Sequence, residues 1–231
     1  MSKIISDINK FIDNLKFDKH RSFRKEIYGL LKKADKDKYD YGNGYFYQSL
    51  EKINLSGLRN SKKRLSEYNL SKLTLNSEIL DIGCNSAFLI CELEQNFKSY
   101  FGIEWNNNLI EIGNKTIKYL NLQKIDLIDG NFLNYNFNNR KFDVIFSFAN
   151  HSTYDKGIIS SDDYFNKCDS LLIKNGTLVI ESHHPNYENK ITFEEMINKL
   201  IKNNNYKQIV KKIIKSNNFY DNGRTFVILQ K

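Results

Sequence analysis

The chain has 231 residues, a formal net charge of +8, and 40% hydrophobic and 13% aromatic residues. This length suffices for one sizeable hydrophobic core, and this composition excludes an intrinsically disordered protein. The sequence holds no apolar run long enough to cross a membrane and no apolar signal segment near its start. We therefore expect a cytoplasmic globular protein that acts without a membrane.

The cysteines and the basic charge carry little functional information. Cys84, Cys91 and Cys168 are odd in number and lack metal-ligand spacing, which indicates buried, reduced thiols. The net positive charge accompanies a general richness in Lys, Asn and Ile, so it supports a nucleic-acid partner only weakly.

Residues 1–70 have the pattern of a helical extension or lid. Apolar residues recur at helical spacing along two stripes, which predicts two helices that pack their apolar faces on the main domain. The stripes are Ile4, Ile5, Ile8, Phe11, Ile12 and Leu15, then Phe23, Ile27, Leu30, Leu31 and Ala34. A further helix is predicted over 62–70, with Ser61 as its N-cap.

Between these helices, residues 39–48 (YDYGNGYFYQ) break the helical pattern and indicate a loop. Five aromatic side chains in ten residues are unusual for an exposed loop. They either fill the core beneath the helices or wall a binding pocket. For the second case, Tyr45 and Tyr47 are candidate substrate-binding residues.

From residue 78 onward, short apolar runs alternate with helical patterns, which is typical of βαβ units and a mostly parallel sheet. Seven strands are predicted over 79–82, 99–103, 125–128, 142–148, 177–180, 209–214 and 225–229. Helices are predicted over 109–120 and 162–172. A short loop at 216–223 joins the last two strands as a hairpin, so the final strand is expected to be antiparallel.

The first predicted strand runs into the turn Leu80-Asp81-Ile82-Gly83-Cys84-Asn85-Ser86-Ala87, and a helix starts near Phe88. A tight turn of small residues at the carboxyl end of a parallel strand lets a ligand approach the backbone. The turn is not a dinucleotide fingerprint, because Asn85 and Phe88 stand where glycines are needed. About 20 residues later, Glu104 ends the second strand, where a carboxylate can accept both hydroxyls of a ribose.

These residues resemble the class I S-adenosylmethionine-dependent methyltransferases over about 78–231. The family's Asp-x-Gly-x-Gly-x-Gly motif matches at Asp81 and Gly83 and departs at Asn85 and Ala87. The resemblance implies S-adenosylmethionine as cofactor and a Rossmann-like α/β domain over 71–231. This domain has a mostly parallel seven-stranded sheet with an antiparallel last strand, preceded by the helical extension.

The resemblance also implies roles for single residues. Glu104 matches the ribose-binding acid, Trp105 lies against the adenine, and Asn131, followed by Phe132, accepts from the adenine amino group. Ser147 lies where the fourth strand holds the methionine end. The methionine carboxylate is assigned to Arg59 in preference to Arg64. The full set of candidate cofactor residues is Asp81, Gly83, Cys84, Asn85, Ala87, Glu104, Trp105, Asn131, Phe132, Ser147 and Arg59.

Three of the four histidines, His151, His183 and His184, follow the fourth and fifth strands. Histidine titrates near neutral pH and suits a general base, so we predict His151 or His183 as the catalytic base, oriented by Glu181. Tyr154 and His184 are candidate substrate-binding residues. A divalent metal on His151, Asp155, Glu181, His183 and His184 is the alternative, and no metal is our expectation.

The sequence thus predicts methyl transfer to O or N of a small polar acceptor, such as a sugar or a nucleotide-linked metabolite. An RNA (tRNA) methyltransferase is an alternative suggested by the charge, although an Asn-Pro-Pro-Tyr-type motif is absent after the fourth strand. A non-catalytic S-adenosylmethionine-binding partner subunit is a third interpretation, suggested by the missing glycines. The oligomeric state is left open.

Overall fold

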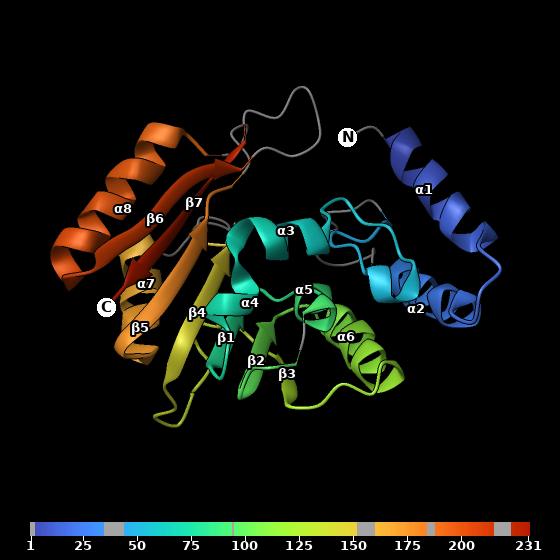
Figure 1. Ribbon diagram of the computed structural model, residues 1–231, viewed down its shortest axis with the longest axis horizontal. Coiled ribbons are helices and arrows are strands. Elements are labelled where there is room, and N and C mark those ends of the chain that lie inside the picture. Colours follow the sequence, from blue (N-terminus) through green and yellow to red (C-terminus); the bar gives the residue numbers. More distant parts are fainter. Residues whose placement is uncertain (1–2, 35–43, 94, 152–159, 184–187, 215–222) are drawn as a thin grey trace. The chain divides into compact units, whose positions relative to one another are not determined.

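The computed structural model describes residues 3–34, 44–93, 95–151, 160–183, 188–214 and 223–231 (Figure 1). They divide into two compact units. The first comprises Met1–Leu73, Cys84–Asn96 and Glu104–Gly130, and the second comprises Thr74–Gly83, Phe97–Ile103 and Asn131–Lys231. Among the described residues, no helix has both the length and the apolar character needed to cross a membrane.

Seven strands form one sheet in the order β3-β2-β1-β4-β5-β7-β6. Their bounds are β1 Glu78–Ile82, β2 Ser99–Glu104, β3 Ile125–Asp129, β4 Phe142–Phe148, β5 Leu172–Glu181, β6 Lys207–Ile214 and β7 Arg224–Gln230. β1 pairs in parallel with β2 and β4, and β4 pairs in parallel with β5. β7 is antiparallel to both β5 and β6. The predicted α/β fold, with its antiparallel last strand, is confirmed.

The strand order places a switch point between β1 and β4, because the chain runs outward through β2 and β3 before it returns to β4. Ligands of open α/β sheets bind beyond the carboxyl ends of the strands at such a point. The predicted strands differ from the observed ones mainly in β5, which begins at Leu172 instead of residue 177. The loop predicted over 216–223 lies outside the described residues, except for Gly223.

In the second unit, helices α7 (Ser161–Leu171) and α8 (Lys190–Asn204) pack on each other, and α7 also packs on β5. The Ser160 hydroxyl caps α7 by accepting from the Asp163 N–H at 3.2 Å. Two carboxylates in the first turn of α7 favour its N-terminal end electrostatically. β1 is buried along four of its five residues, which explains why three of these four are apolar.

The first unit holds β3 and the remaining helices. These are α1 (Lys3–Leu15), α2 (Arg21–Ala34), the 3₁₀ helix η1 (Glu51–Ile53), α3 (Ser61–Tyr68), α4 (Leu70–Leu73), α5 (Phe88–Glu92) and α6 (Asn107–Tyr119). The N-cap of α3 is Asn60, whose side chain accepts from the Lys63 N–H at 2.7 Å. The prediction of Ser61 as N-cap is wrong, because the Ser61 hydroxyl instead donates to the Ser49 carbonyl.

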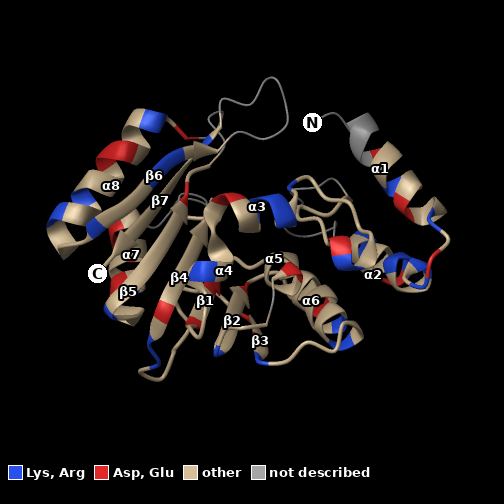
Figure 2. Ribbon diagram, in the orientation of Figure 1, with Lys and Arg blue, Asp and Glu red and all other residues tan. Residues whose placement is uncertain are grey.

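The two N-terminal helices expose opposite kinds of face. α2 buries Phe23, Ile27 and Leu31, as predicted. α1 leaves its apolar stripe 45–64% exposed at Ile8, Phe11, Ile12 and Leu15, and buries Asp13 completely. The prediction that α1 packs through its apolar face is therefore wrong, and its polar face makes the contacts within this unit. In Figure 2, charged residues are scattered along both helices.

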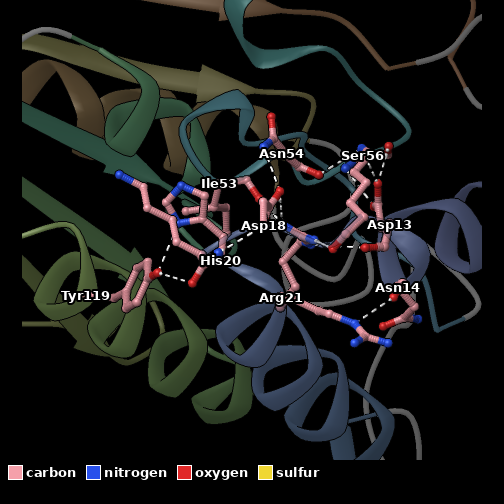
Figure 3. Close-up of polar contacts among 12 residues, drawn as sticks. Asp13, Asn14, Asp18, His20, Arg21, Ile53, Asn54, Ser56 and Tyr119 are labelled. Atoms are coloured by element: carbon pink, nitrogen blue, oxygen red, sulfur yellow. Dashed lines mark hydrogen bonds and ion pairs between the residues drawn. The ribbon is translucent and has the colours of Figure 1, made fainter.

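A buried arginine, Arg24 of α2, joins α1 and the loop around η1 through Asp13, Asp18 and Ile53, which are labelled in Figure 3. Arg24 is completely buried, and its Nη1 donates to the Asp18 carboxylate at 2.8 and 3.0 Å and to the Ile53 carbonyl at 2.9 Å. A hydrogen bond from Asn54 is the main cause that lowers the pKa of Asp18 to about 2. Asp13 accepts from the Ser56 N–H at 2.8 Å. These bonds satisfy the buried charges and make the three segments one piece.

This piece is bonded to α5, the helix that follows the predicted cofactor turn. Gln48 Oε1 accepts from the Leu89 N–H at 3.0 Å, and the Glu92 carboxylate accepts from the Glu51 N–H at 2.8 Å. The ring centroids of Phe46 and Phe88 lie 5.1 Å apart. The segment around residues 46–51 is therefore part of the framework that holds α5.

Two glycines of this unit allow a matched test of that packing. A Cβ atom on Gly57 would lie 2.2 Å from the Gln48 carbonyl carbon, whereas a Cβ atom on Gly29 meets nothing within 4 Å. We expect Gly57→Ala to lower the free energy of unfolding by about 1–3 kcal/mol through overpacking. Gly29→Ala, in the interior of α2, should raise it by about 0.5–1 kcal/mol. Urea unfolding of both variants measures this, and equal shifts would contradict the close approach at Gly57.

Candidate functional site

The turn after β1 has left-handed backbone at each position that the resembling motif fills with glycine. Gly83, Asn85 and Ala87 have φ angles of 67°, 55° and 55°. A left-handed residue with a side chain costs roughly 1–2 kcal/mol, and Asn bears this cost more readily than most residues. Asn85 Oδ1 also accepts from the Ser86 N–H at 2.8 Å. The two departures from the glycine motif therefore preserve the shape of the turn.

Glu104, at the end of β2, is the central polar group beside this turn in the first unit. Its Oε2 accepts from the Asn85 N–H at 3.2 Å, and its Oε1 accepts from the N–H groups of Trp105 at 2.9 Å and Asn106 at 3.1 Å. Burial raises the pKa of Glu104, and the three N–H bonds oppose that shift. A carboxylate offers about four lone-pair sites, so one Oε2 site is left for a ligand hydroxyl.

Helix α6 fixes the same turn from another direction. It begins after Asn106, whose side chain accepts from the Asn108 N–H at 3.1 Å. A Cβ atom on Gly113 would lie 3.2 Å from the Ser86 carbonyl oxygen, so the helix and the turn are in direct contact. Trp105, the predicted adenine neighbour, directly follows Glu104 in the chain and is half-buried.

The predicted cofactor residues of the second unit have varied surroundings. Asp81 is buried and accepts from the Tyr100 hydroxyl at 2.7 Å. Asn131 Oδ1 accepts from the Leu133 N–H at 2.9 Å, which closes the turn after β3. Phe132 is completely buried, and its ring lies 5.3 Å from the Tyr164 ring, so this side chain is part of the core. Ser147 is also completely buried, at the end of β4.

Beyond β4 and β5, one carboxylate contacts the imidazole of one histidine and the backbone N–H of another. His151 Nε2 lies 2.8 Å from Glu188 Oε1, and the His183 N–H donates to Glu188 Oε2 at 2.7 Å. The two imidazole centroids are 5.5 Å apart. Burial, followed by the neighbouring His151, lowers the pKa of His183 to about 4. Burial raises the pKa of Glu188, but the hydrogen bond and charge of His151 bring it below its ordinary value.

Glu188 is the residue that sequence reasoning missed. Glu181, predicted as the orienting acid, is completely buried and accepts from Arg224 Nη1 at 3.1 Å, whereas Glu188 holds His151. Glu188 stands directly before Asn189, the N-cap of α8, and this was the signal available in the sequence. Only the fold brings it back to residue 151.

Other predicted residues divide between described and undescribed parts of the chain. Tyr154, His184 and Asp155 lie outside the described residues. Within the described part, no group of three or more His, Cys, Asp or Glu side chains could hold a metal ion. The candidate substrate residues Tyr45 and Tyr47 are both present in the first unit.

The aromatic and basic candidates of residues 45–64 are largely enclosed. Tyr45 is 2% exposed, and burial raises its pKa to about 12, which supports a role in the core. Tyr47 is half-buried, and its carbonyl accepts from the Arg59 N–H at 2.7 Å. Arg59 is half-buried, whereas Arg64 is 3% exposed with its guanidinium 5.6 Å from the Tyr68 ring centroid.

The left-handed turn predicts that two substitutions at Asn85 lead to different stabilities. Asn85→Gly and Asn85→Val both lose the hydrogen bond to the Ser86 N–H, so their difference isolates the backbone cost. We expect the Val variant to be less stable than the Gly variant by roughly 1–2 kcal/mol, because β-branched residues avoid positive φ. Thermal and urea unfolding measure the difference, and equal stabilities would mean that position 85 does not require this conformation.

Comparison with known proteins agrees with this geometry. A family model described as a methyltransferase domain matches residues 73–223. No curated protein matches the chain.

Solved structures share the fold at low sequence identity. The N-methyltransferase NodS from Bradyrhizobium japonicum WM9, in complex with S-adenosyl-L-homocysteine, has a TM-score of 0.63 and 14% identity, covering 89% of this chain and 98% of that one. An S-adenosylmethionine-dependent methyltransferase from Clostridium acetobutylicum has a TM-score of 0.57 and 16% identity, covering 78% and 94%. A ribosomal protein L11 methylase from Lactobacillus delbrueckii subsp. bulgaricus has 0.54 and 12%, covering 74% and 78%. The chain therefore belongs to the methyltransferase domain family and is a class I S-adenosylmethionine-dependent methyltransferase.

Proposed function

We propose that the enzyme methylates a nitrogen or oxygen atom of a small polar acceptor, such as a sugar or a nucleotide-linked metabolite, with His151 as general base. The observation that carries this proposal is the bond between His151 Nε2 and Glu188 at the carboxyl end of β4. A base held by a carboxylate is the arrangement that fixes one tautomer and one ring orientation.

The hydrogen-bond pattern assigns the two nitrogens of His151. Glu188 is ionised near neutral pH, so it accepts, and in the neutral imidazole the proton lies on His151 Nε2. Nδ1 then carries a lone pair, and it is buried with no hydrogen-bond partner among the described residues. This nitrogen is therefore suited to take the proton that an amine or hydroxyl loses during methylation.

His183 supports the same proposal in a different role. With a pKa lowered to about 4 it is neutral at physiological pH, and it is too weak a base to compete with an ordinary imidazole. Its Nε2 is buried with no hydrogen-bond partner among the described residues, so it can bind a polar substrate atom. The charges of Arg224 and Glu181 offset each other, because the two side chains form an ion pair. The carboxylate of Glu188 therefore gives this region a negative charge, which favours a neutral or cationic acceptor.

S-Adenosylmethionine is proposed to bind at the turn after β1 and at Glu104. S-Adenosylmethionine, when bound, supplies the methyl group on a positively charged sulfur. Glu104 is proposed to accept from a ribose hydroxyl through Oε2, and Trp105 to cover the adenine. Asn131 is proposed to bind the adenine amino group, and Arg59 the methionine carboxylate. The backbone of Gly83, Cys84, Asn85 and Ala87, together with Asp81, Phe132 and Ser147, completes the proposed set.

The helical extension over 1–70 is proposed to serve the methyltransferase domain over 71–231 as part of its substrate-binding apparatus, with the half-buried Tyr47 as the candidate side chain and Tyr45 in the core. An RNA acceptor is the second candidate function, because the net charge is +8. Affinity for RNA that collapses as salt rises would favour it over a small metabolite.

The assignment of Glu104 predicts a loss of cofactor affinity in Glu104→Gln. A hydrogen bond to a charged acceptor contributes about 1.5–3 kcal/mol, so we expect S-adenosylhomocysteine to bind roughly 10- to 100-fold more weakly. In the wild type, affinity should fall as pH decreases through the raised pKa of Glu104, because the protonated acid accepts poorly. Calorimetry measures both effects. Glu111→Gln, at an exposed position of α6, is the control and should bind as the wild type does.

The assignment of the base predicts that His151→Ala lowers turnover about 10²- to 10⁴-fold, with cofactor affinity unchanged. Glu188→Gln should lower turnover less, because the imidazole remains but loses its orienting charge. Release of S-adenosylhomocysteine is measured across a panel of small amine and hydroxyl acceptors. His20→Ala, in the α1–α2 connection, is the matched control. Full turnover of His151→Ala with an acceptor that the wild type methylates would exclude His151 as the base.

A further inference from the structure

The side chain of Asn150 spans the switch point of the sheet within the second unit. Its Nδ2 donates to the carbonyl of Ile82, the last residue of β1. Asn150 itself follows β4, two residues beyond Phe148. We propose that Asn150 is a positioning residue for cofactor binding, which fixes the start of the cofactor turn through the Ile82 carbonyl.

The orientation of this amide is determined by two hydroxyl groups. Asn150 Oδ1 accepts from Tyr164 Oη at 2.8 Å and from Ser147 Oγ at 2.9 Å. The two hydroxyl oxygens lie 3.0 Å from each other, so the three side chains form a closed triangle. Tyr164 and Ser147 are 1% and 0% exposed, which shields these bonds from water. The oxygen of the amide is thus held toward the hydroxyls, and the nitrogen toward β1.

The same amide lies directly against Gly83. A Cβ atom on Gly83 would lie 2.9 Å from Asn150 Nδ2 and 3.5 Å from Asn150 Cβ. Gly83 also has a φ of 67°, and its N–H donates to the Ile103 carbonyl at 2.8 Å. The peptide that enters the turn is therefore held from the β2 side by Ile103 and from the β4 side by Asn150.

The backbone before Asn150 is held in an unusual conformation. Ala149 has a φ of 57°, and its N–H donates to the Glu181 carbonyl at 2.9 Å. A left-handed alanine persists only where surrounding contacts determine it. This bond to the end of β5 fixes the direction in which the chain leaves β4, so that the Asn150 side chain reaches β1. His151 is the next residue of the same segment. One segment thus supports both the cofactor turn and, if the proposed function holds, the general base.

A pH profile of Asn150→Asp tests the proposal. At pH 8 the aspartate presents a negative oxygen to the Ile82 carbonyl, so S-adenosylhomocysteine should bind at least tenfold more weakly than to the wild type. As the pH falls toward the ordinary aspartate pKa of about 4, the protonated acid can donate to that carbonyl, so the ratio of the two affinities should move back toward one. Calorimetry at each pH, with the wild type as reference, removes the titration of Glu104 from the comparison.

Two further variants keep the outcome decisive. Asn203→Asp, at an exposed position of α8, introduces the same charge and should bind as the wild type does at every pH. Tyr164→Phe removes one donor to Asn150 Oδ1 while keeping the ring, and should weaken binding by about three- to tenfold even if Asn150→Asp fails to fold. Wild-type affinity of Asn150→Asp at pH 8, or a ratio of affinities that does not move toward one as the pH is lowered toward 4, would overturn the proposal. The measurement needs no methyl acceptor, so it is independent of the proposed substrate and base.

Discussion

The site depends first on one buried carboxylate. Glu104 is 7% exposed and would be costly to bury without partners, and three backbone N–H groups satisfy it. One of these groups belongs to the turn after β1 and the other two to the start of α6. A single side chain therefore determines where the turn lies, where α6 begins, and where a lone pair is left for a ligand. The turn can therefore keep its left-handed backbone with Asn85 and Ala87 in place of the two glycines of the motif, because the bond to Glu104 helps to hold its shape.

A second buried charge whose hydrogen bonds are satisfied organises the N-terminal part of the first unit. Arg24, completely buried, gathers α1, α2 and the η1 loop, and that loop is bonded to α5 through Gln48 and Glu51. The extension is thus structurally continuous with the helix that follows the turn. This explains how α1 can bury a polar face and leave its apolar stripe exposed: the hydrogen bonds of Asp13 decide its orientation.

The second unit contains the polar residues to which the proposals assign the chemistry. Asn150 and His151 are consecutive, yet their side chains meet different partners, one on β1 and one on Glu188. The left-handed Ala149 makes this divergence possible by turning the chain sharply after β4. Cofactor positioning and proton removal are proposed to act from this one short segment.

The sequence by itself determined the alternation of strands and helices, the antiparallel last strand, the place of the turn after β1 and the position of Glu104 at the end of β2. These features depend on local periodicity and on short spacings along the chain, and both can be read directly from the amino-acid sequence. Only the tertiary structure decided that Glu188, and not Glu181, holds His151, that Asn60 caps α3, and that α1 faces outward with its apolar stripe. Each of these depends on which of several similar polar groups comes within hydrogen-bond distance after folding. That competition is resolved by contacts between residues far apart in the chain, such as the 37 positions that separate His151 from Glu188.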